Sequence, residues 1–469
     1  MKDGRPNILF IMSDDHASHA MSCYGSRINE TPNLDRISSG GMRFDNCFCT
    51  NSICTPSRAT ILTGTYNHIN GVTTLASKMD NRLLTFPKLL RESGYQTAAV
   101  GKWHLGQGPQ HQPTGFDFWR VLPGQGLYHD PEMIDETGKK VFKGYVTDLI
   151  ADMSLEWLKN RDKERPFCLL CHHKAPHRHW EPDEKHAHMY DDVDILEPET
   201  FNDDYSNRAS AAAAATMRIE RDLNARDLKV PVPDGLTKAQ EKSWKYQRYI
   251  KDYLRVIASI DDNVGRLLDY LDEEDLSENT LVIYTSDQGF FLGDHGWYDK
   301  RFMYEESLRM PFIIRYPKEI KPGTINKDII LNVDFAPLFL DLAGIEVPQE
   351  FQGASFRPLL KGHTPEDWRS SMYYRYWMHK AHHNVYAHYG VRTSRYKLIY
   401  YYSDALGQPG AIDETYKPEW ELFDLEKDPY ELNNVYDVPS YANVVKELKD
   451  EMHRLQAEVG DERYEKEIE

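Results

Sequence analysis

Short apolar runs that end abruptly at polar residues recur along the first two thirds of the chain. The first is NILFIM, residues 7–12, which stops at Ser13. Similar runs follow at residues 97–101, 167–173, 281–287 and 311–317. Runs of this length are typical of strands that are buried on both faces of a parallel sheet.

Segments with helical spacing of apolar residues lie between these runs. They occupy residues 83–92, 148–160, 244–271 and 333–344, and Gly344 is placed to end the last of them. Alternation of helix and strand predicts an α/β fold with a large, mostly parallel sheet sandwiched by helices.

The pattern changes after residue 365. The following segments are rich in aromatic residues with strand-like alternation, and a charged amphipathic helix is expected at residues 441–459. We therefore predict an α/β domain at residues 1–365 and a smaller antiparallel sheet plus helix at residues 366–469. The polar stretch 187–242, with its alanine run and PVPDG turn, is interpreted as a surface insertion.

Charge and composition narrow the classes of protein. The formal net charge is −18, which argues against a protein that covers nucleic acid or anionic lipid with a broad surface. No apolar window is long enough for a membrane span, and the first residues do not have the pattern of an export signal. The compartment stays open, and a periplasmic or extracellular location is expected if a signal peptide has been removed.

The six cysteines do not suggest a disulfide framework. Cys168 and Cys171 have a zinc-like spacing, but they lie inside an apolar run and no second cysteine pair completes a tetrahedral site. We interpret both as core residues of a strand.

Polar residues that carry chemistry follow four of the predicted strands. They are Asp14 and Asp15, Lys102 and His104, His177, and Asp287 and Gln288. Because the carboxyl ends of parallel strands share one edge of a sheet, we expect these side chains to converge.

Each of these groups also has an ordinary interpretation. An aspartate pair after a strand is often a helix cap, and Lys102 with His104 is compatible with a plain surface loop. Together, however, three carboxylates and an amide oxygen form a hard, oxygen-only site that suits calcium or magnesium and not zinc. Beside such a cation, the Lys-His pair fits an anion clamp with a general acid or base.

The segment CTPSRATILTG, residues 54–64, matches the sulfatase signature Cys-x-Pro-Ser-Arg-x3-Leu-Thr-Gly at each fixed position. A strand-to-helix turn explains Pro56 and Ser57 but not Cys54 and Arg58. The chain thus resembles the type I, formylglycine-dependent sulfatases of the alkaline phosphatase superfamily, and within them the bacterial carbohydrate sulfatases that act on glycosaminoglycans. GKWHLG at 101–106, TPNLDRI at 31–37 and residues 422–434 also resemble that family.

This resemblance implies a site, a cofactor and a partner. The implied metal ligands for one Ca²⁺, in preference to Mg²⁺, are Asp14, Asp15, the modified Cys54, Asp287 and Gln288. The implied catalytic residues are Cys54, Arg58, Lys102, His104, His177 and Lys300. Gln288 stands where many relatives have asparagine. A formylglycine-generating or anaerobic sulfatase-maturating enzyme is the implied partner that converts Cys54.

The family mechanism assigns each group a task. A hydroxyl of hydrated formylglycine attacks sulfur, Lys102 and Lys300 stabilise the sulfate oxygens, and His177 protonates the leaving sugar oxygen. His104 then removes the proton whose loss lets the sulfated hemiacetal expel sulfate.

The expected substrate is a sulfated carbohydrate, with the 6-O-sulfate of an N-acetylglucosamine type of sugar as the first hypothesis. Candidate substrate contacts are Trp103, Arg178, His179, Trp180, Trp297 and His379, and the C-terminal subdomain is expected to complete the pocket. One alternative is a phosphonate monoester hydrolase or phosphodiesterase of the same superfamily. The other is an inactive protein that binds sulfated glycans, which predicts a degenerate site, whereas all of the expected catalytic residues are present.

Overall fold

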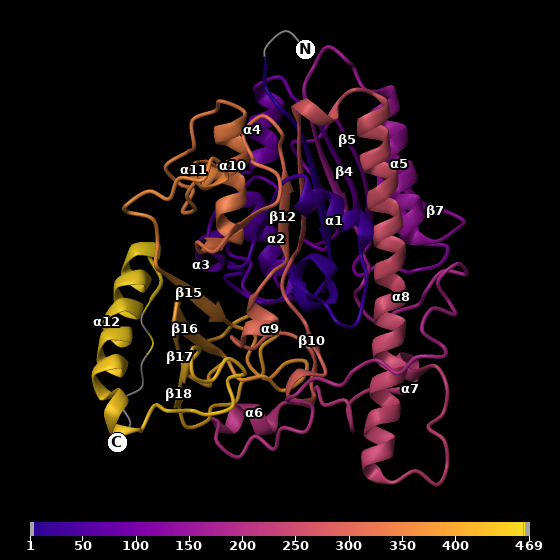
Figure 1. Cartoon of the computed structure of the whole chain (residues 1–469). Helices are drawn as coiled ribbons and strands as arrows, with labels where there is room; N and C mark the ends of the chain where they lie inside the picture. Colours follow the sequence, from indigo (N-terminus) through magenta and orange to yellow (C-terminus); the bar gives the residue numbers. More distant parts are fainter. Residues whose placement is uncertain (1–3, 463, 465–469) are drawn as a thin grey trace.

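A ten-stranded mixed sheet organises the protein (Figure 1). The computed structural model describes residues 4–462 and 464. In spatial order the strands are β13 (Thr324–Asn326), β2 (Met42–Phe44), β12 (Phe312–Arg315), β9 (Thr280–Ser286), β1 (Asn7–Ser13), β8 (Phe167–His172), β4 (Gln96–Lys102), β5 (Phe118–Leu122), β6 (Glu132–Asp135) and β7 (Gly138–Val141).

The centre of this sheet is parallel. β1 pairs in parallel with β9 and β8, and β4 pairs in parallel with β8 and β5. β1, β9, β8 and β4 are buried along their whole length, which explains the apolar run at the centre of each strand. The predicted strand at residues 311–317 is β12, and it runs antiparallel to β9. The prediction of a mostly parallel sheet is therefore confirmed, with antiparallel strands toward both edges.

Helices cover both faces of the sheet (Figure 1). α5 (Val146–Asn160) packs against α8 (Lys238–Glu273), which also contacts α1 (Pro32–Ser39). α10 (Phe335–Leu342) packs against α2 (Cys54–Thr63) and α4 (Phe86–Glu92) on the other face. α8 begins earlier than its apolar pattern suggested, because Thr237 and Gln240 form a capping box at its start.

The segment 187–242 is not the simple surface insertion that its polar sequence suggested. It carries the short helices α6 (Ser210–Ala214) and α7 (Ala225–Leu228), and it places many apolar side chains in the core, including Phe201, Ala211 and Met217. These residues are scattered among charged ones without a helical or strand period, so the sequence pattern did not reveal their burial.

The C-terminal region is a separate antiparallel sheet with one long helix, as predicted. The strands are β15 (Ser371–Tyr376), β16 (His388–Thr393), β17 (Tyr396–Tyr401) and β18 (Glu419–Asp424), in that spatial order. α12 (Ala442–Val459) contacts β15, β16 and β17. α9 (Glu305–Leu308) joins the two sheets, because Glu305 forms ion pairs with Lys397 and Arg392. The domain boundary after residue 365 stays a prediction.

Two further expectations concern segments of this fold. Cys168 and Cys171 are fully buried in β8, in agreement with a core role.

Among the described residues, no helix has the length and apolar character needed to cross a membrane.

Candidate active site

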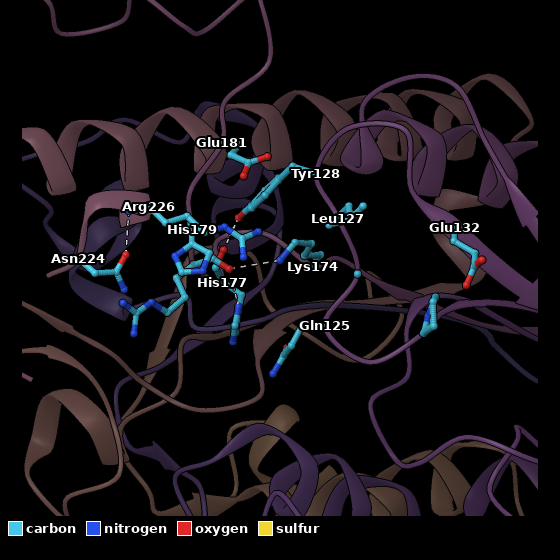
Figure 2. A pocket seen from close by; sticks show the side chains of 13 residues that line it. Gln125, Leu127, Tyr128, Glu132, Lys174, His177, His179, Glu181, Asn224 and Arg226 are labelled. Atoms are coloured by element: carbon cyan, nitrogen blue, oxygen red, sulfur yellow. Dashed lines mark hydrogen bonds between the residues drawn. The ribbon is translucent and has the colours of Figure 1, made fainter. Parts of the chain in front are cut away.

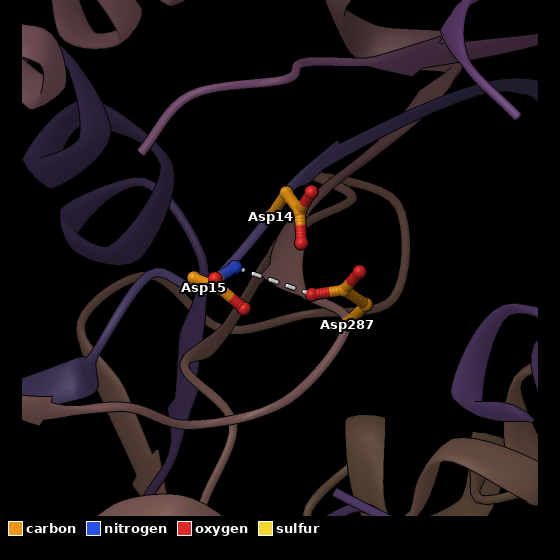
Figure 3. Close-up of side chains that lie close together, drawn as sticks. All are labelled: Asp14, Asp15 and Asp287. Carbon is orange, nitrogen blue, oxygen red and sulfur yellow. Dashed lines mark hydrogen bonds between the residues drawn. The ribbon is translucent and has the colours of Figure 1, made fainter. Parts of the chain in front are cut away.

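Three aspartates meet at the carboxyl edge of the central strands (Figure 3). Asp14 and Asp15 follow β1, and Asp287 follows the adjacent β9. One oxygen of each carboxylate lies within 4.8 Å of the others, and all three residues are buried. The backbone N–H of Asp15 donates to Oδ1 of Asp287 over 3.3 Å. The predicted convergence of the strand ends is thus present in the structure.

Each of these carboxylates is paired with a cation from another segment. Lys102, at the end of β4, forms an ion pair with Asp14, and Lys300 forms one with Asp15. Nε of Arg58 donates to Oδ2 of Asp287 over 2.9 Å. The buried negative charge is therefore compensated residue by residue, as buried ions require.

Cys54 is the first residue of α2, and Arg58 lies one turn further along the same helix. Arg58 also donates from Nη1 to the carbonyl oxygen of Lys102 over 2.8 Å, which ties α2 to the end of β4. The Cys54 side chain is buried, and burial raises the pKa of its thiol to about 11, although Lys300 opposes the shift. Unmodified Cys54 is therefore a protonated thiol at neutral pH and a weak nucleophile.

Two histidines lie close to the charged residues of the cluster. Nδ1 of His104 lies 3.2 Å from Oγ1 of Thr55. Nδ1 of His177 lies 2.8 Å from the carbonyl oxygen of Arg178, so it is the donor, and its Nε2 faces Oδ2 of Asp15 at 4.0 Å. Burial, with a further contribution from Lys102, lowers the pKa of both imidazoles well below the usual value. Both rings are neutral at pH 7 in this state.

The donor set at the aspartate cluster fits a divalent metal ion. Oδ1 of Asp14 and Oε1 of Gln288 are buried, and neither has a hydrogen-bond partner in the part of the chain that the structure describes. Gln288 uses its Nε2 to donate to Asp15, which leaves the amide oxygen free. Carboxylate and amide oxygens are the ligands that hard cations such as Ca²⁺ and Mg²⁺ prefer. The cluster is a candidate site for such a cation.

A cavity of about 660 Å³ opens beside His177 (Figure 2). Its lining includes Gln125, Tyr128, Lys174, Arg178, His179, Asn224 and Arg226. Arg178 donates to both carboxylate oxygens of Asp227, and Nδ1 of His179 lies 2.7 Å from Oδ1 of the same residue. Asp227 is fully buried in α7. Through Asp227, the segment 187–242 thus fixes the wall of the cavity that Arg178 and His179 form.

The structure separates the predicted substrate contacts into two groups. Arg178 and His179 line the cavity. Trp103, Trp180, Trp297 and His379 do not line it and are buried in packed surroundings. Trp297 stacks against Tyr205 with ring centroids 5.2 Å apart, and Trp180 packs on Tyr249 at 4.7 Å. These four side chains pack within the fold and are not among the residues that line the cavity.

Several polar residues near the site were not predicted. Asp299 and Arg301 flank Lys300, and Nε of Arg301 donates to Oδ1 of Asp299 over 3.0 Å. Nε2 of His383 lies 3.3 Å from Oδ2 of Asp299. Among the lining residues, Gln125 accepts a hydrogen bond from Lys102. The acidic and basic residues around Lys300 were visible in the sequence, but nothing there indicated which of them pair.

The fold and this cluster match a known class of hydrolase. The sulfatase family model matches residues 6–345, and the model for the N-sulphoglucosamine sulphohydrolase C-terminal region matches residues 293–458. The chain belongs to the sulfatase family, and it is a sulfuric ester hydrolase. The family implies a formylglycine nucleophile and a divalent metal ion, in agreement with Cys54 and the aspartate cluster.

Particular relatives are more informative than the family. The chain is 45% identical to an N-acetylglucosamine-6-O-sulfatase of Bacteroides thetaiotaomicron, over 97% of this chain and 87% of the relative. A solved structure of a protein in complex with its substrate D-glucosamine-2-N,6-O-disulfate is 44% identical, with a TM-score of 0.90, and the match covers 97% of this chain and 98% of that one. A phosphonate monoester hydrolase from Silicibacter pomeroyi shares the fold at 21% identity, with a TM-score of 0.76 over 97% and 95% of the two chains.

Proposed function

We propose that this enzyme removes the 6-O-sulfate group from an N-substituted glucosamine in a sugar derived from a glycosaminoglycan. The observation that carries the proposal is the 45% identity, over nearly the whole chain, to an N-acetylglucosamine-6-O-sulfatase. The cavity beside His177 supports it, because Arg178, His179 and Asn224 offer the donors that sugar hydroxyls need. The similarity to the phosphonate monoester hydrolase is at a level that shows the fold alone.

We assign the metal as Ca²⁺, held by Asp14, Asp15, Asp287 and Gln288 together with residue 54. When bound, the cation supplies positive charge that lowers the pKa of the attacking hydroxyl and offsets the charge of the sulfate. The buried, hydrogen-bond-free oxygens of Asp14 and Gln288 support this assignment. Ca²⁺ accepts irregular sets of about six to eight oxygen ligands, whereas Mg²⁺ requires near-octahedral geometry.

The cations of the chain surround the position of the sulfate. Arg58, Lys102 and Lys300 bring three positive charges to the loops that hold the metal ligands. A sulfate ester carries its negative charge on oxygens that repel a nucleophile, so these side chains neutralise it and position the sulfur for attack.

His177 and His104 carry out different proton transfers in the proposed mechanism. His177 Nδ1 donates to the Arg178 carbonyl, which leaves Nε2, 4.0 Å from Oδ2 of Asp15, as the atom that gives a proton to the leaving sugar oxygen. The anionic substrate raises the pKa of His177 as it binds, which loads the ring with that proton. His104 lies next to Thr55, and its neutral ring acts as the base that completes sulfate release.

Formylglycine at position 54 requires a maturation enzyme as a partner. We propose conversion by a formylglycine-generating or an anaerobic sulfatase-maturating enzyme, and a periplasmic or extracellular location for the mature protein. Cys54 and Arg58 within residues 54–64 supply the motif for conversion.

The test is sulfate release by protein that was coexpressed with a maturation enzyme, after peptide mass spectrometry has established conversion of Cys54. The substrates are N-acetylglucosamine carrying sulfate at O6, O4 or O3, each with and without chelator, and an aryl phosphonate ester. Metal-dependent release from the 6-O ester supports the proposal. Faster cleavage of the 3-O or 4-O ester refutes the position, and faster cleavage of the phosphonate ester favours the alternative hydrolase.

A further inference from the structure

Lys174 is a buried cation in the cavity wall that has no carboxylate partner among the described residues. Its Nζ lies 4.6 Å from the ring centroid of Tyr128 and 3.4 Å from the carbonyl oxygen of Arg178. Only 3% of the residue is exposed. A buried ammonium without a counter-ion is unfavourable, so the free protein leaves this charge incompletely compensated.

The surroundings of Lys174 hold it close to the catalytic residues. The hydroxyl of Tyr128 donates to the carbonyl oxygen of His177 over 2.6 Å, so the ring beneath the ammonium is fixed to the segment that carries the proposed acid. Figure 2 shows the Lys174 side chain beside His177 in the cavity. Burial lowers the pKa of Lys174 to about 8, while Glu181 and Asp15 act in the opposite direction. The ammonium therefore stays mostly protonated at neutral pH.

A second cation borders the same cavity. Arg226 extends from α7, is exposed, and forms no ion pair with a carboxylate in the described ranges. By contrast, Lys102 and Lys300 are each paired with an aspartate of the metal cluster. The cavity thus holds two cations that form no ion pair with a carboxylate in the described ranges, although Glu132 and Glu181 also line it.

We propose that Lys174, assisted by Arg226, binds a second anionic group of the substrate, distinct from the sulfate ester that is cleaved. This inference rests on the proposed function. The group is a sulfo group on the amino nitrogen of the same glucosamine, or the carboxylate of a neighbouring uronic acid. Both are delocalised anions that accept charge-assisted hydrogen bonds from an ammonium.

The experiment uses the converted holoenzyme and two matched substrate pairs with the same 6-O ester. The first pair is N-sulfo and N-acetyl glucosamine 6-sulfate. The second is N-acetylglucosamine 6-sulfate linked to a uronic acid, free or as its methyl ester. In at least one pair, the wild type should prefer the anionic member about tenfold in kcat/KM, as expected for one charge-assisted contact. Lys174→Gln should bring that ratio close to one and leave the neutral substrate within about threefold.

Two further variants make the result specific. Arg226→Gln should lower the ratio by a smaller factor, about threefold, because its exposed charge is screened by water and salt. As Arg226 is on the surface, this variant keeps the proposal testable if Lys174→Gln does not fold. Lys143→Gln removes an exposed lysine that is paired with Asp130, and it should leave both ratios unchanged.

The possible outcomes are distinct. An unchanged ratio in both pairs overturns the inference, and so does a parallel loss on all four substrates, because that pattern assigns Lys174 to the cleaved sulfate or to the fold. A converted enzyme that releases sulfate from none of the four refutes the proposed function, and the inference with it. Loss of preference in only one pair identifies which anionic group Lys174 binds.

Discussion

The aspartate cluster differs from Lys174 in the wall of the cavity beside His177 in how the charge of its buried side chains is neutralised. In the cluster, the carboxylates of Asp14, Asp15 and Asp287 each have a cationic partner from another segment. In the wall, Lys174 has an aromatic ring and a carbonyl oxygen but no carboxylate partner in the described part of the chain. The carboxylates of the cluster are neutralised by the chain itself, whereas the counter-charge of Lys174 is proposed to come from the substrate. Chemistry and selectivity are therefore expected to respond differently to mutation.

The largest effect is expected at Cys54. Cys54→Ala should lower sulfatase activity by at least about 10³-fold on all esters, because no other group supplies the nucleophile. The midpoint of thermal unfolding, measured on the same samples, should stay within a few degrees, because only one sulfur atom is lost from the core. More than one per cent of residual activity contradicts the assignment of the nucleophile.

His177 lies between the aspartate cluster and the cavity, and its replacement tests whether it acts as the general acid. His177→Ala should reduce kcat on a sugar sulfate by about 10²–10⁴-fold, the usual contribution of a general acid. An aryl sulfate has a leaving group that needs no proton, so its kcat should fall much less. Stopped assays of sulfate release on both substrates give the comparison, and equal losses on the two argue against a role as acid.

A substitution at Asp227 is expected to affect only the cavity wall formed by Arg178 and His179. Asp227→Asn keeps the size of the side chain but removes the charge that holds Arg178 and His179. We expect KM for the sugar substrate to rise by about tenfold while kcat stays within about threefold, since the residue contacts only the groups that position the sugar. A collapse of kcat at unchanged KM contradicts the separation of wall and cluster.

The smallest effect is the dependence of selectivity on pH. The pKa of Lys174 is lowered by burial to about 8, so its ammonium is present below that pH and is lost above it. In the substrate pair with the preferred anion, the kcat/KM ratio should therefore decline as pH rises through about 8, by several fold in total, while Lys174→Gln shows a flat ratio. A flat ratio in the wild type contradicts the role of this charge.

The two regions also differ in how much of them the sequence predicts. Four adjacent strands end near the cluster: Asp14 and Asp287 directly follow β1 and β9, Lys102 ends β4, and His177 lies in the loop after β8. The alternation of helices and strands is enough to bring these residues to one edge of the sheet. The motif at residues 54–64 adds Cys54, and the apolar runs predict the strands that carry the cluster.

The wall could not be predicted in the same way. Asp227 lies in a segment without apolar period, and its contact with Arg178 exists only because α7 packs against the core. The tryptophans were expected near the sugar, but they are buried and do not line the cavity, because a large aromatic residue beside a motif often packs in the core. Trp180 and Trp297 are fully buried for that reason. Tertiary packing, and not local pattern, decides these positions.

The burial of Cys54 at the start of α2 affects when this residue can be modified relative to folding. The residue is 1% exposed, and all of α2 is buried around it. If a maturation enzyme converts Cys54, as proposed above, it needs access to this segment before the protein folds around it, and conversion then competes with folding. A chain that folds first keeps its thiol for as long as the native state lasts, because native domains unfold slowly. Under that proposal, the specific activity of a purified sample measures the fraction of chains in which Cys54 was converted before folding.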